Sequence, residues 1–147
     1  MVGKDLDDLP FREALAEPVL FAREFCGVRL HRGQQQWLRR AHAPENLLHA
    51  GNRWGKSLVQ AVKFLHQCVF KIRPLRFAGV ERYEAVNASI TLDQANIIFG
   101  HAVALIKRNP VFGYLVDEIK YSPFPQIQFA NGATMWARST VRFLRRS

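Results

Sequence analysis

The sequence predicts an α/β domain built around a largely parallel sheet. Candidate strands and helices alternate along the chain, and near its end an Asn-Gly pair lies between two apolar runs, which is typical of a β-hairpin. The 147 residues are 48% hydrophobic and 22% charged, the size and composition of one globular domain rather than of a disordered chain. We expect a helical N-terminal segment, residues 1–43, and an α/β core, residues 44–147, in a single compact unit.

The first third of the chain is expected to be helical. Pro10 and Pro18 each suit the first turn of a helix, and apolar residues at helical spacing follow until Gly27 ends the run. A further short helix is expected from Gln34 to His42, followed by a small apolar strand from Asn46 to His49.

The remaining elements follow in alternation. The spacing of apolar residues after Lys56 predicts a helix buried on one broad face. Thr91 and Gln94 have the spacing of a capping box, which predicts a helix start there. The other elements expected in this part are a strand from Tyr83 to Ile90, a helix continuing through Ile106, and a hairpin of Gln126 to Ala130 and Ala133 to Ala137 around Asn131-Gly132.

Charge and cysteine content narrow the classes of function. The formal net charge is +9, and residues 31–147 hold 17 of the 21 bases but six of the 12 acids, so a polyanionic partner is plausible on electrostatic grounds. Cys26 and Cys68 share no metal-ligand spacing and are expected to be buried thiols. The N-terminus does not have the pattern of a signal peptide, and we expect no membrane span.

The most informative stretch runs from Leu47 to Ser57, where a short strand leads through a glycine-containing turn into an apolar helix. This is the layout of a phosphate-binding P-loop, GxxxxGK[ST], with Ala50 in place of the first glycine. Backbone amides and the helix N-terminus would bind phosphate oxygens, Lys56 would reach the terminal phosphates, and the Ser57 hydroxyl would help to hold Mg²⁺. The predicted phosphate-binding residues are Ala50, Gly51, Asn52, Arg53, Trp54, Gly55, Lys56 and Ser57.

Three side chains near this loop have alternative interpretations. Arg53 is placed to stabilise charge on a transferring phosphoryl group, or it faces solvent. Trp54 is expected to pack against the loop rather than to stack on a base. The amide of Gln34, upstream of the loop, has the donor and acceptor needed to bind adenine, although adjacent glutamines are commonly a polar helix face.

The order of these segments resembles the ATPase domain of tailed-phage terminase large subunits. The glutamine segment, the loop at 50–57, Ala-Ser-Ile-Thr-Leu-Asp-Gln-Ala at 88–95 and the Asn-Gly hairpin carry the resemblance, which covers most of residues 20–140. It implies a partial RecA-like fold, ATP and Mg²⁺ as cofactors, adenine contact by Gln34, and a catalytic role for Lys56 and, as a charge stabiliser, Arg53. The family's motor packages double-stranded DNA into a capsid.

The resemblance also implies partners and a compartment. These are the portal protein, the terminase small subunit and further copies of the chain on the portal, in the cytoplasm of an infected bacterium. The chain departs from the family in having no room for a nuclease domain and no convincing acidic Walker B strand after the hairpin. Asp117 and Glu118 are a weak candidate for that acid pair, because they precede the hairpin. We therefore expect the chain to be truncated before the acidic strand, to bind ATP and to hydrolyse it very poorly.

Other functions remain open at this point. One is a basic nucleic-acid-binding module in which the loop contacts backbone phosphates independently of ATP. Another is a fragment of a different P-loop NTPase, such as a helicase, in which Asp117 and Glu118 do hold the metal. A third is a non-functional remnant with exposed apolar sheet edges.

Overall fold

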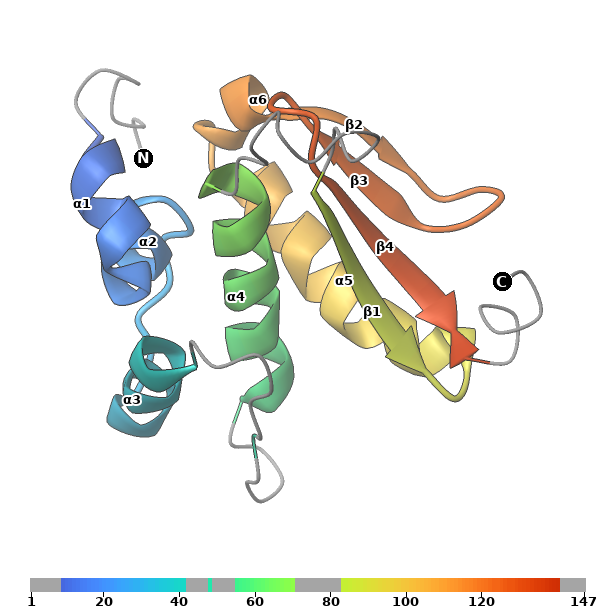
Figure 1. The fold of residues 1–147 in the computed structure, drawn as a ribbon, viewed down its shortest axis with the longest axis horizontal. Helices are drawn as coiled ribbons and strands as arrows, with labels where there is room; N and C mark the ends of the chain where they lie inside the picture. Colours follow the sequence, from blue (N-terminus) through green and yellow to red (C-terminus); the bar gives the residue numbers. More distant parts are fainter. Residues whose placement is uncertain (1–8, 42–47, 49–54, 71–82, 141–147) are drawn as a thin grey trace, which may run out of the picture.

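The computed structural model describes residues 9–41, 48, 55–70 and 83–140, which form six helices and one four-stranded sheet (Figure 1). The helices are α1 Phe11–Ala16, α2 Pro18–Glu24, α3 Arg32–Arg40, α4 Lys56–Phe70, α5 Leu92–Arg108 and α6 Phe112–Leu115. The strands are β1 Glu84–Ser89, β2 Val116–Lys120, β3 Gln126–Phe129 and β4 Thr134–Ser139. The packing of helices on a single sheet confirms the predicted α/β class.

The predicted parallel sheet is only partly matched. The strand order is β1-β4-β3-β2, with β1 and β4 parallel and the other two pairings antiparallel. Short connections join β2 to β3 and β3 to β4, and such connections allow only antiparallel neighbours, whereas parallel pairing needs a longer crossover. The strand predicted over 46–49 lies outside the described residues except for Leu48, which is not in a strand.

The predicted hairpin is confirmed. β3 and β4 pair in antiparallel register, with Ile127 opposite Met135, on either side of Asn131 and Gly132. Gly132 has a φ of 90°, a left-handed conformation that glycine adopts without a steric penalty. The turn therefore needs the glycine that the Asn-Gly pair supplies.

The helices form two groups around the long helix α4. α4 and α5 contact each other and both contact β1 and β4, so they cover one face of the sheet. α2 and α3 contact α4, and Figure 1 shows them with α1 on the side of α4 away from the sheet. The apolar face of α4 is fully buried, as its spacing predicts, at Val59, Ala61, Val62, Leu65 and Cys68. α4 is thus the central element of the fold.

A cluster of aromatic rings joins the N-terminal helices to the core. The ring of Phe21, which is fully buried, lies 5.1 Å from Phe25, 5.3 Å from His66 and 5.6 Å from Phe70. Ring pairs at these separations contribute about 0.5–1.5 kcal/mol beyond their burial. His66 also bonds through Nε2 to the carbonyl oxygen of Ala14, 2.9 Å away. α1 and α2 are therefore fixed on α4.

The local signals for helix ends agree with the structure, with small shifts. Pro10 is the N-cap of α1, Pro18 is the first residue of α2, and Gly27 has a φ of 65° where the run ends. Thr91 caps α5 by accepting a hydrogen bond from the Gln94 amide at 3.2 Å, which is the Thr91 half of the predicted capping box. Helix α3 begins at Arg32, two residues before the predicted start.

Both cysteines are buried free thiols, as the sequence predicts. Burial raises the pKa of the Cys68 thiol to about 12 and raises the pKa of Cys26 further. The two thiols are therefore neutral and unreactive in the folded protein. In the part of the chain that the structure describes, none of the helices is long and apolar enough to cross a membrane.

Candidate nucleotide site at the start of helix α4

The described part of the predicted phosphate loop is its last three residues. Gly55 has a φ of 90°, and Lys56 and Ser57 are the first two residues of α4, both half-buried. Amides in the first turn of a helix have no carbonyl partner within it, and together with the helix dipole they favour an anion. The remaining predicted loop residues lie outside the described residues; they are Ala50, Gly51, Asn52, Arg53 and Trp54.

Gln34 lies directly beside the end of this loop. Its Nε2 donates to the carbonyl oxygen of Gly55 at 3.0 Å, although the two residues are 21 positions apart in the sequence. The Gln34 side chain is 4% exposed. The structure thus brings together the residue predicted to contact adenine and the residues predicted to contact phosphate.

A capping box at the start of α3 fixes the Gln34 side chain. Gln34 Oε1 accepts from the His31 amide at 2.9 Å, and His31 Nδ1 accepts from the Gln34 amide at 3.2 Å. This cap was not predicted from the sequence, because histidine is not among the usual N-cap residues. The glutamine three positions later was the available signal. The cap also explains why α3 starts earlier than predicted.

The close approach of Gln34 gives Gly55 a second reason to be glycine. A Cβ on residue 55 would clash with Gln34 Nε2, and the φ of 90° disfavours any other residue. Residue 55 therefore has to be glycine for two reasons, its positive φ and the space that the Gln34 side chain occupies.

The Gln34 amide retains bonding capacity after these contacts. An amide group has two N–H donors and two acceptor positions, and the described contacts use one of each. The remaining N–H donor and the remaining acceptor position of the Gln34 amide are the complementary pair of groups that adenine recognition needs. The hydrogen bond to Gly55 would orient the group.

Asp117 and Glu118 lie away from this site. Both are exposed on β2, the edge strand on the opposite side of the sheet from β1, and Glu118 lies 3.8 Å from Lys120. Figure 1 shows β2 toward the opposite end of the molecule from the first turn of α4. The structure therefore does not bring this acid pair to the predicted phosphate loop.

The end of β1 faces the same side as the candidate site. Figure 1 shows the carboxyl end of β1, and the turn into α5, toward the end of the molecule where α4 begins. Asn87 in β1 is buried, and its Nδ2 donates to the carbonyl oxygen of Ala95 at 2.5 Å. This bond ties the end of the strand to the first turn of α5. Ligand sites of α/β sheets characteristically lie at the carboxyl ends of the strands.

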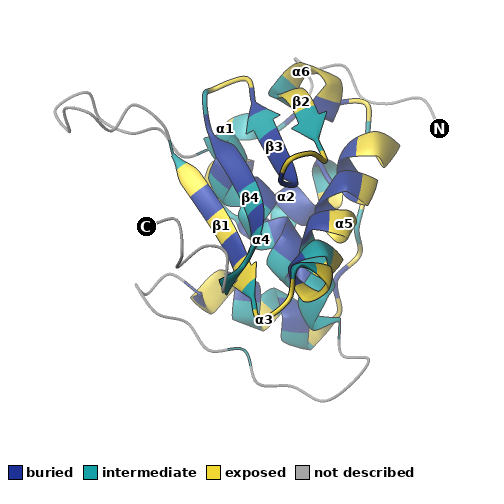
Figure 2. Cartoon of the chain, turned by 90° about the vertical axis from the view of Figure 1, so that its right-hand side faces the viewer, coloured by how far each residue is buried: buried dark blue, intermediate teal, exposed yellow. Residues whose placement is uncertain are grey.

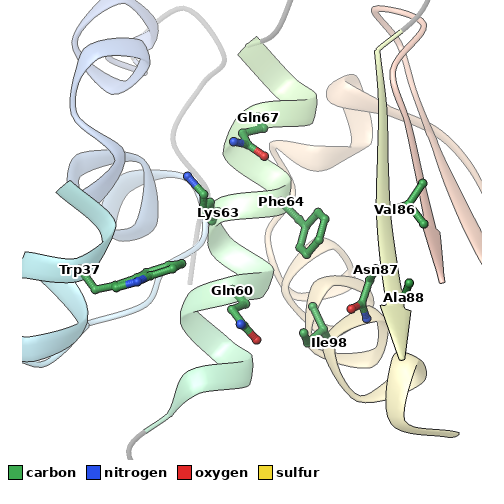
Figure 3. A pocket seen from close by; sticks show the side chains of 9 residues that line it. All are labelled: Trp37, Gln60, Lys63, Phe64, Gln67, Val86, Asn87, Ala88 and Ile98. Atoms are coloured by element: carbon green, nitrogen blue, oxygen red, sulfur yellow. The ribbon is translucent and has the colours of Figure 1, made fainter. Parts of the chain in front are cut away.

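A separate pocket of about 400 Å³ lies farther along α4 (Figure 3). Its described lining includes neither Gln34 nor the first turn of α4, so it is distinct from the candidate site. Lys63 at its rim lies 5.9 Å from the centroid of the Trp37 ring. The lining residues are Trp37, Gln60, Lys63, Phe64, Gln67, Val86, Asn87, Ala88 and Ile98.

The described residues offer no metal site built from protein ligands alone. Among them there is no group of three or more His, Cys, Asp or Glu side chains that is able to hold a metal ion. Hydroxyl and phosphate oxygens are suitable ligands for Mg²⁺, which commonly enters such sites with a nucleotide. The Ser57 hydroxyl fits this mode of binding.

Solved structures share the fold of this chain, and two of them are phage large terminases. No family model and no curated protein sequence matches the chain. The first is the large terminase of bacteriophage HK97, with a TM-score of 0.67 and 20% identity over 85% of this chain and 27% of that one. The second is a mutant ATPase domain of the large terminase of Thermus phage P74-26, with a TM-score of 0.65 and 16% identity over 85% of this chain and 52% of that one.

These matches confirm the predicted fold. The chain has the RecA-like α/β arrangement of phage large-terminase ATPase domains across most of its length. It spans about a quarter of the first protein and about half of the second. At these identities the likeness concerns the fold alone.

Proposed function

We propose that this chain is the nucleotide-binding part of a DNA-packaging ATPase of the phage large-terminase type. The observation that carries the proposal is the hydrogen bond from Gln34 to Gly55, because it joins two sequence features that were each assigned to the same nucleotide. The shared fold supports the proposal, since the sequence motifs occur here on the framework of terminase ATPase domains.

In this proposal the phosphates bind at the start of α4. Lys56 provides a positive charge for the terminal phosphates, and the amides of Ser57 and Leu58 in the first helical turn provide hydrogen bonds. Arg53, in the same loop, stabilises the charge on the transferring phosphoryl group. Adenine contacts the remaining donor and acceptor of Gln34, whose side chain the capping box holds in place.

Mg²⁺ enters with the nucleotide in this proposal. The residues present fit that role, because Ser57 in the first turn of α4 offers a hydroxyl oxygen beside the proposed phosphate position. When bound, the ion neutralises phosphate charge and polarises the terminal phosphate. The residues of this chain hold the phosphates in position and provide charge beside them.

The same proposal includes the role of the whole DNA-packaging assembly. ATP hydrolysis drives translocation of double-stranded DNA into a capsid, with the portal, a terminase small subunit and further copies of the chain as partners in the cytoplasm of an infected bacterium. The net charge of +9 supports a polyanionic partner. The position of Asp117 and Glu118 on the far edge strand argues against the helicase alternative, which needs them at the metal.

The test is equilibrium binding of a fluorescent ATP analogue with Mg²⁺ to the 147-residue chain and its Lys56→Ala variant. We expect saturable binding that the variant weakens by about 10- to 100-fold, because a charge-assisted contact contributes about 1.5–3 kcal/mol. Lys107→Ala, which removes an exposed lysine at the end of α5, is the matched control and should bind normally.

Circular dichroism and urea unfolding of each variant separate loss of binding from loss of folding. A folded Lys56→Ala variant that binds the analogue as tightly as the unmodified chain would contradict the site. A folded, unmodified chain that binds no nucleotide would contradict the proposed function.

A further inference from the structure

The outward side of α3 is rich in exposed arginine. Arg32, Arg39 and Arg40 are exposed on the helix, and Arg29 is exposed just before it. Residues 25–44 contain no Asp or Glu. The opposite side of the helix faces the protein, where Gln34 and Leu38 are buried. α3 thus has one side in the core and one basic side in solvent.

The arginines of the helix project to one side. Arg39 and Arg40 follow Arg32 by seven and eight positions, which places the three arginines on one face of an α-helix along about 12 Å of its axis. Figure 2 shows α3 at the edge of the molecule, with exposed residues on it. A duplex DNA carries one phosphate charge per about 1.7 Å of its axis, so several phosphates lie within that length.

One local carboxylate compensates one of these arginines. Arg39 Nε lies 3.2 Å from both carboxylate oxygens of Glu17, which also accepts a hydrogen bond from the Val19 amide. Among the described residues, Arg29, Arg32 and Arg40 have no acidic partner within ion-pair distance. The uncompensated positive charge of this surface is therefore held by these three residues.

The helix that carries this charge is anchored from the inside at both ends. At its start Gln34 bonds to Gly55, and at its end Lys63 Nζ donates to the carbonyl oxygen of Ala41 at 2.6 Å. A fixed helix loses little conformational freedom when its side chains bind a ligand. The inner anchor is also part of the proposed nucleotide site, so one helix borders both surfaces.

We propose that Arg29, Arg32 and Arg40 form a surface that binds the phosphate backbone of double-stranded DNA. This inference rests on the proposed function, which supplies DNA as the partner, and it assigns the surface that contacts it. A membrane fits the surface less well, because a helix that lies on a membrane inserts large apolar side chains, and the outer side of α3 has Arg32, Gln36, Arg39 and Arg40 instead. Arginine contacts to phosphate carry no base sequence preference.

The experiment measures binding of a short fluorescent DNA duplex to the 147-residue chain over a range of salt concentrations, without nucleotide. The test variant is Arg32→Gln/Arg40→Gln, and the matched control is Arg12→Gln/Arg108→Gln, which removes the same charge from exposed positions on α1 and α5. Each lost phosphate contact lowers the slope of log affinity against log salt by about 0.9. We expect the test variant to lower the slope by about 2 and the affinity on the order of 10- to 100-fold near 0.1 M salt, for any sequence.

The outcomes separate failure of this DNA-binding surface from failure of the proposed function. A test variant with the slope of the control would overturn the surface, and loss of slope in Arg145→Gln/Arg146→Gln instead would assign DNA contact to the chain's basic end. An unmodified chain that binds anionic phosphatidylglycerol vesicles but no DNA would overturn DNA as the partner. The nucleotide assay with Lys56→Ala is independent of all these results.

Discussion

Amide side chains hold both ends of helix α4, but they leave different backbone groups of the helix available. At its start, Gln34 reaches from α3 and donates to the carbonyl oxygen of Gly55, just before the helix. At its end, Asn131 reaches from the β3–β4 turn and donates to the carbonyl oxygens of Cys68 and Val69, at 2.8 and 3.0 Å. Each amide connects α4 to a segment far away in the sequence.

The difference lies in which backbone groups of the helix remain available. Asn131 satisfies two of the carbonyl groups that the last turn leaves without partners in the helix, those of Cys68 and Val69. Gln34 bonds to the carbonyl oxygen of Gly55, and the amides of Ser57 and Leu58 in the first turn have no hydrogen bond to a side chain that the structure describes. We infer that the C-terminal end of α4 has a structural role and that its N-terminal end is suited to bind an anionic ligand.

Among substitutions at the two ends of α4, Gly55→Ala is expected to have the largest effect on stability. The added Cβ would clash with Gln34 Nε2, and alanine is strained at a φ of 90°. Strain of this kind costs about 1–3 kcal/mol, and the lost hydrogen bond about 1 kcal/mol more. Urea unfolding should therefore show a loss of about 2–4 kcal/mol, accompanied by weaker binding of the ATP analogue.

Two further variants separate the strain at residue 55 from its contact with Gln34. Gly100→Ala, in an exposed position of α5 with no atom within 4 Å of the new Cβ, should stabilise the protein by about 0.5–1 kcal/mol. Gln34→Ala combined with Gly55→Ala removes the clash but not the strain in the backbone. If the double variant loses the full sum of the two single effects, Gln34 and Gly55 are not coupled, and the contact between them does not hold this end of the helix.

At the C-terminal end of α4 we expect a substitution to lower the free energy of unfolding by a smaller amount and to leave nucleotide binding unchanged. Asn131→Ala removes the bonds to Cys68 and Val69, together with the bond from the Ala133 amide to Asn131 Oδ1. We expect a loss of about 2 kcal/mol in unfolding free energy, because helix carbonyls lose their partners, and unchanged binding of the ATP analogue. Reduced nucleotide affinity in this variant would remove the distinction between the two ends.

Asn131→Asp separates the two roles of this side chain. Aspartate keeps the acceptor for the Ala133 amide but has no donor for the α4 carbonyls, and its charge is unfavourable beside the C-terminal end of a helix dipole. It should be at least as destabilising as Asn131→Ala at neutral pH. An Asp variant as stable as the unmodified chain would assign the role of Asn131 to the turn and not to the helix.

Most secondary structure was predictable from local patterns. The spacing of Val62, Leu65 and Cys68 is enough to predict α4, and Asn131-Gly132 is enough to predict the hairpin. The sheet was less predictable, because the pairing of strands depends on the connections between them. The prediction of a largely parallel sheet matched at β1 and β4 only.

The contacts that join elements were beyond local reasoning. Gln34 and Gly55 are 21 residues apart, and Asn131 and Cys68 are 63 apart, so no periodicity or turn signal links them. The sequence indicated Gln34 as a polar side chain near a nucleotide. Only the packing of α3 on α4 shows that its amide is shared with the backbone of the loop.

A smaller effect than those expected at Gly55 and Asn131 reports on the C-terminal end of α4 alone, through the Cys68 thiol in the last helical turn. Burial raises its pKa from 9.0 to about 12, so unfolding at high pH releases a proton that the folded state retains. The stabilising contribution is complete below pH 9 and is lost as the pH rises from 9 toward 12. Between pH 8 and 10 the loss is about 1.4 kcal/mol for this one thiol.

Urea unfolding across this pH range checks the expectation. Cys26 is also buried with a raised pKa, so the unmodified chain should have two such contributions, and Cys68→Ala and Cys26→Ala should each flatten the decline by a similar amount. The absolute stability of each variant falls because of the cavity, but the pH slope is independent of that loss. An unchanged slope in Cys68→Ala would mean that water reaches the last turn of α4, and that Asn131 does not close this end of the helix.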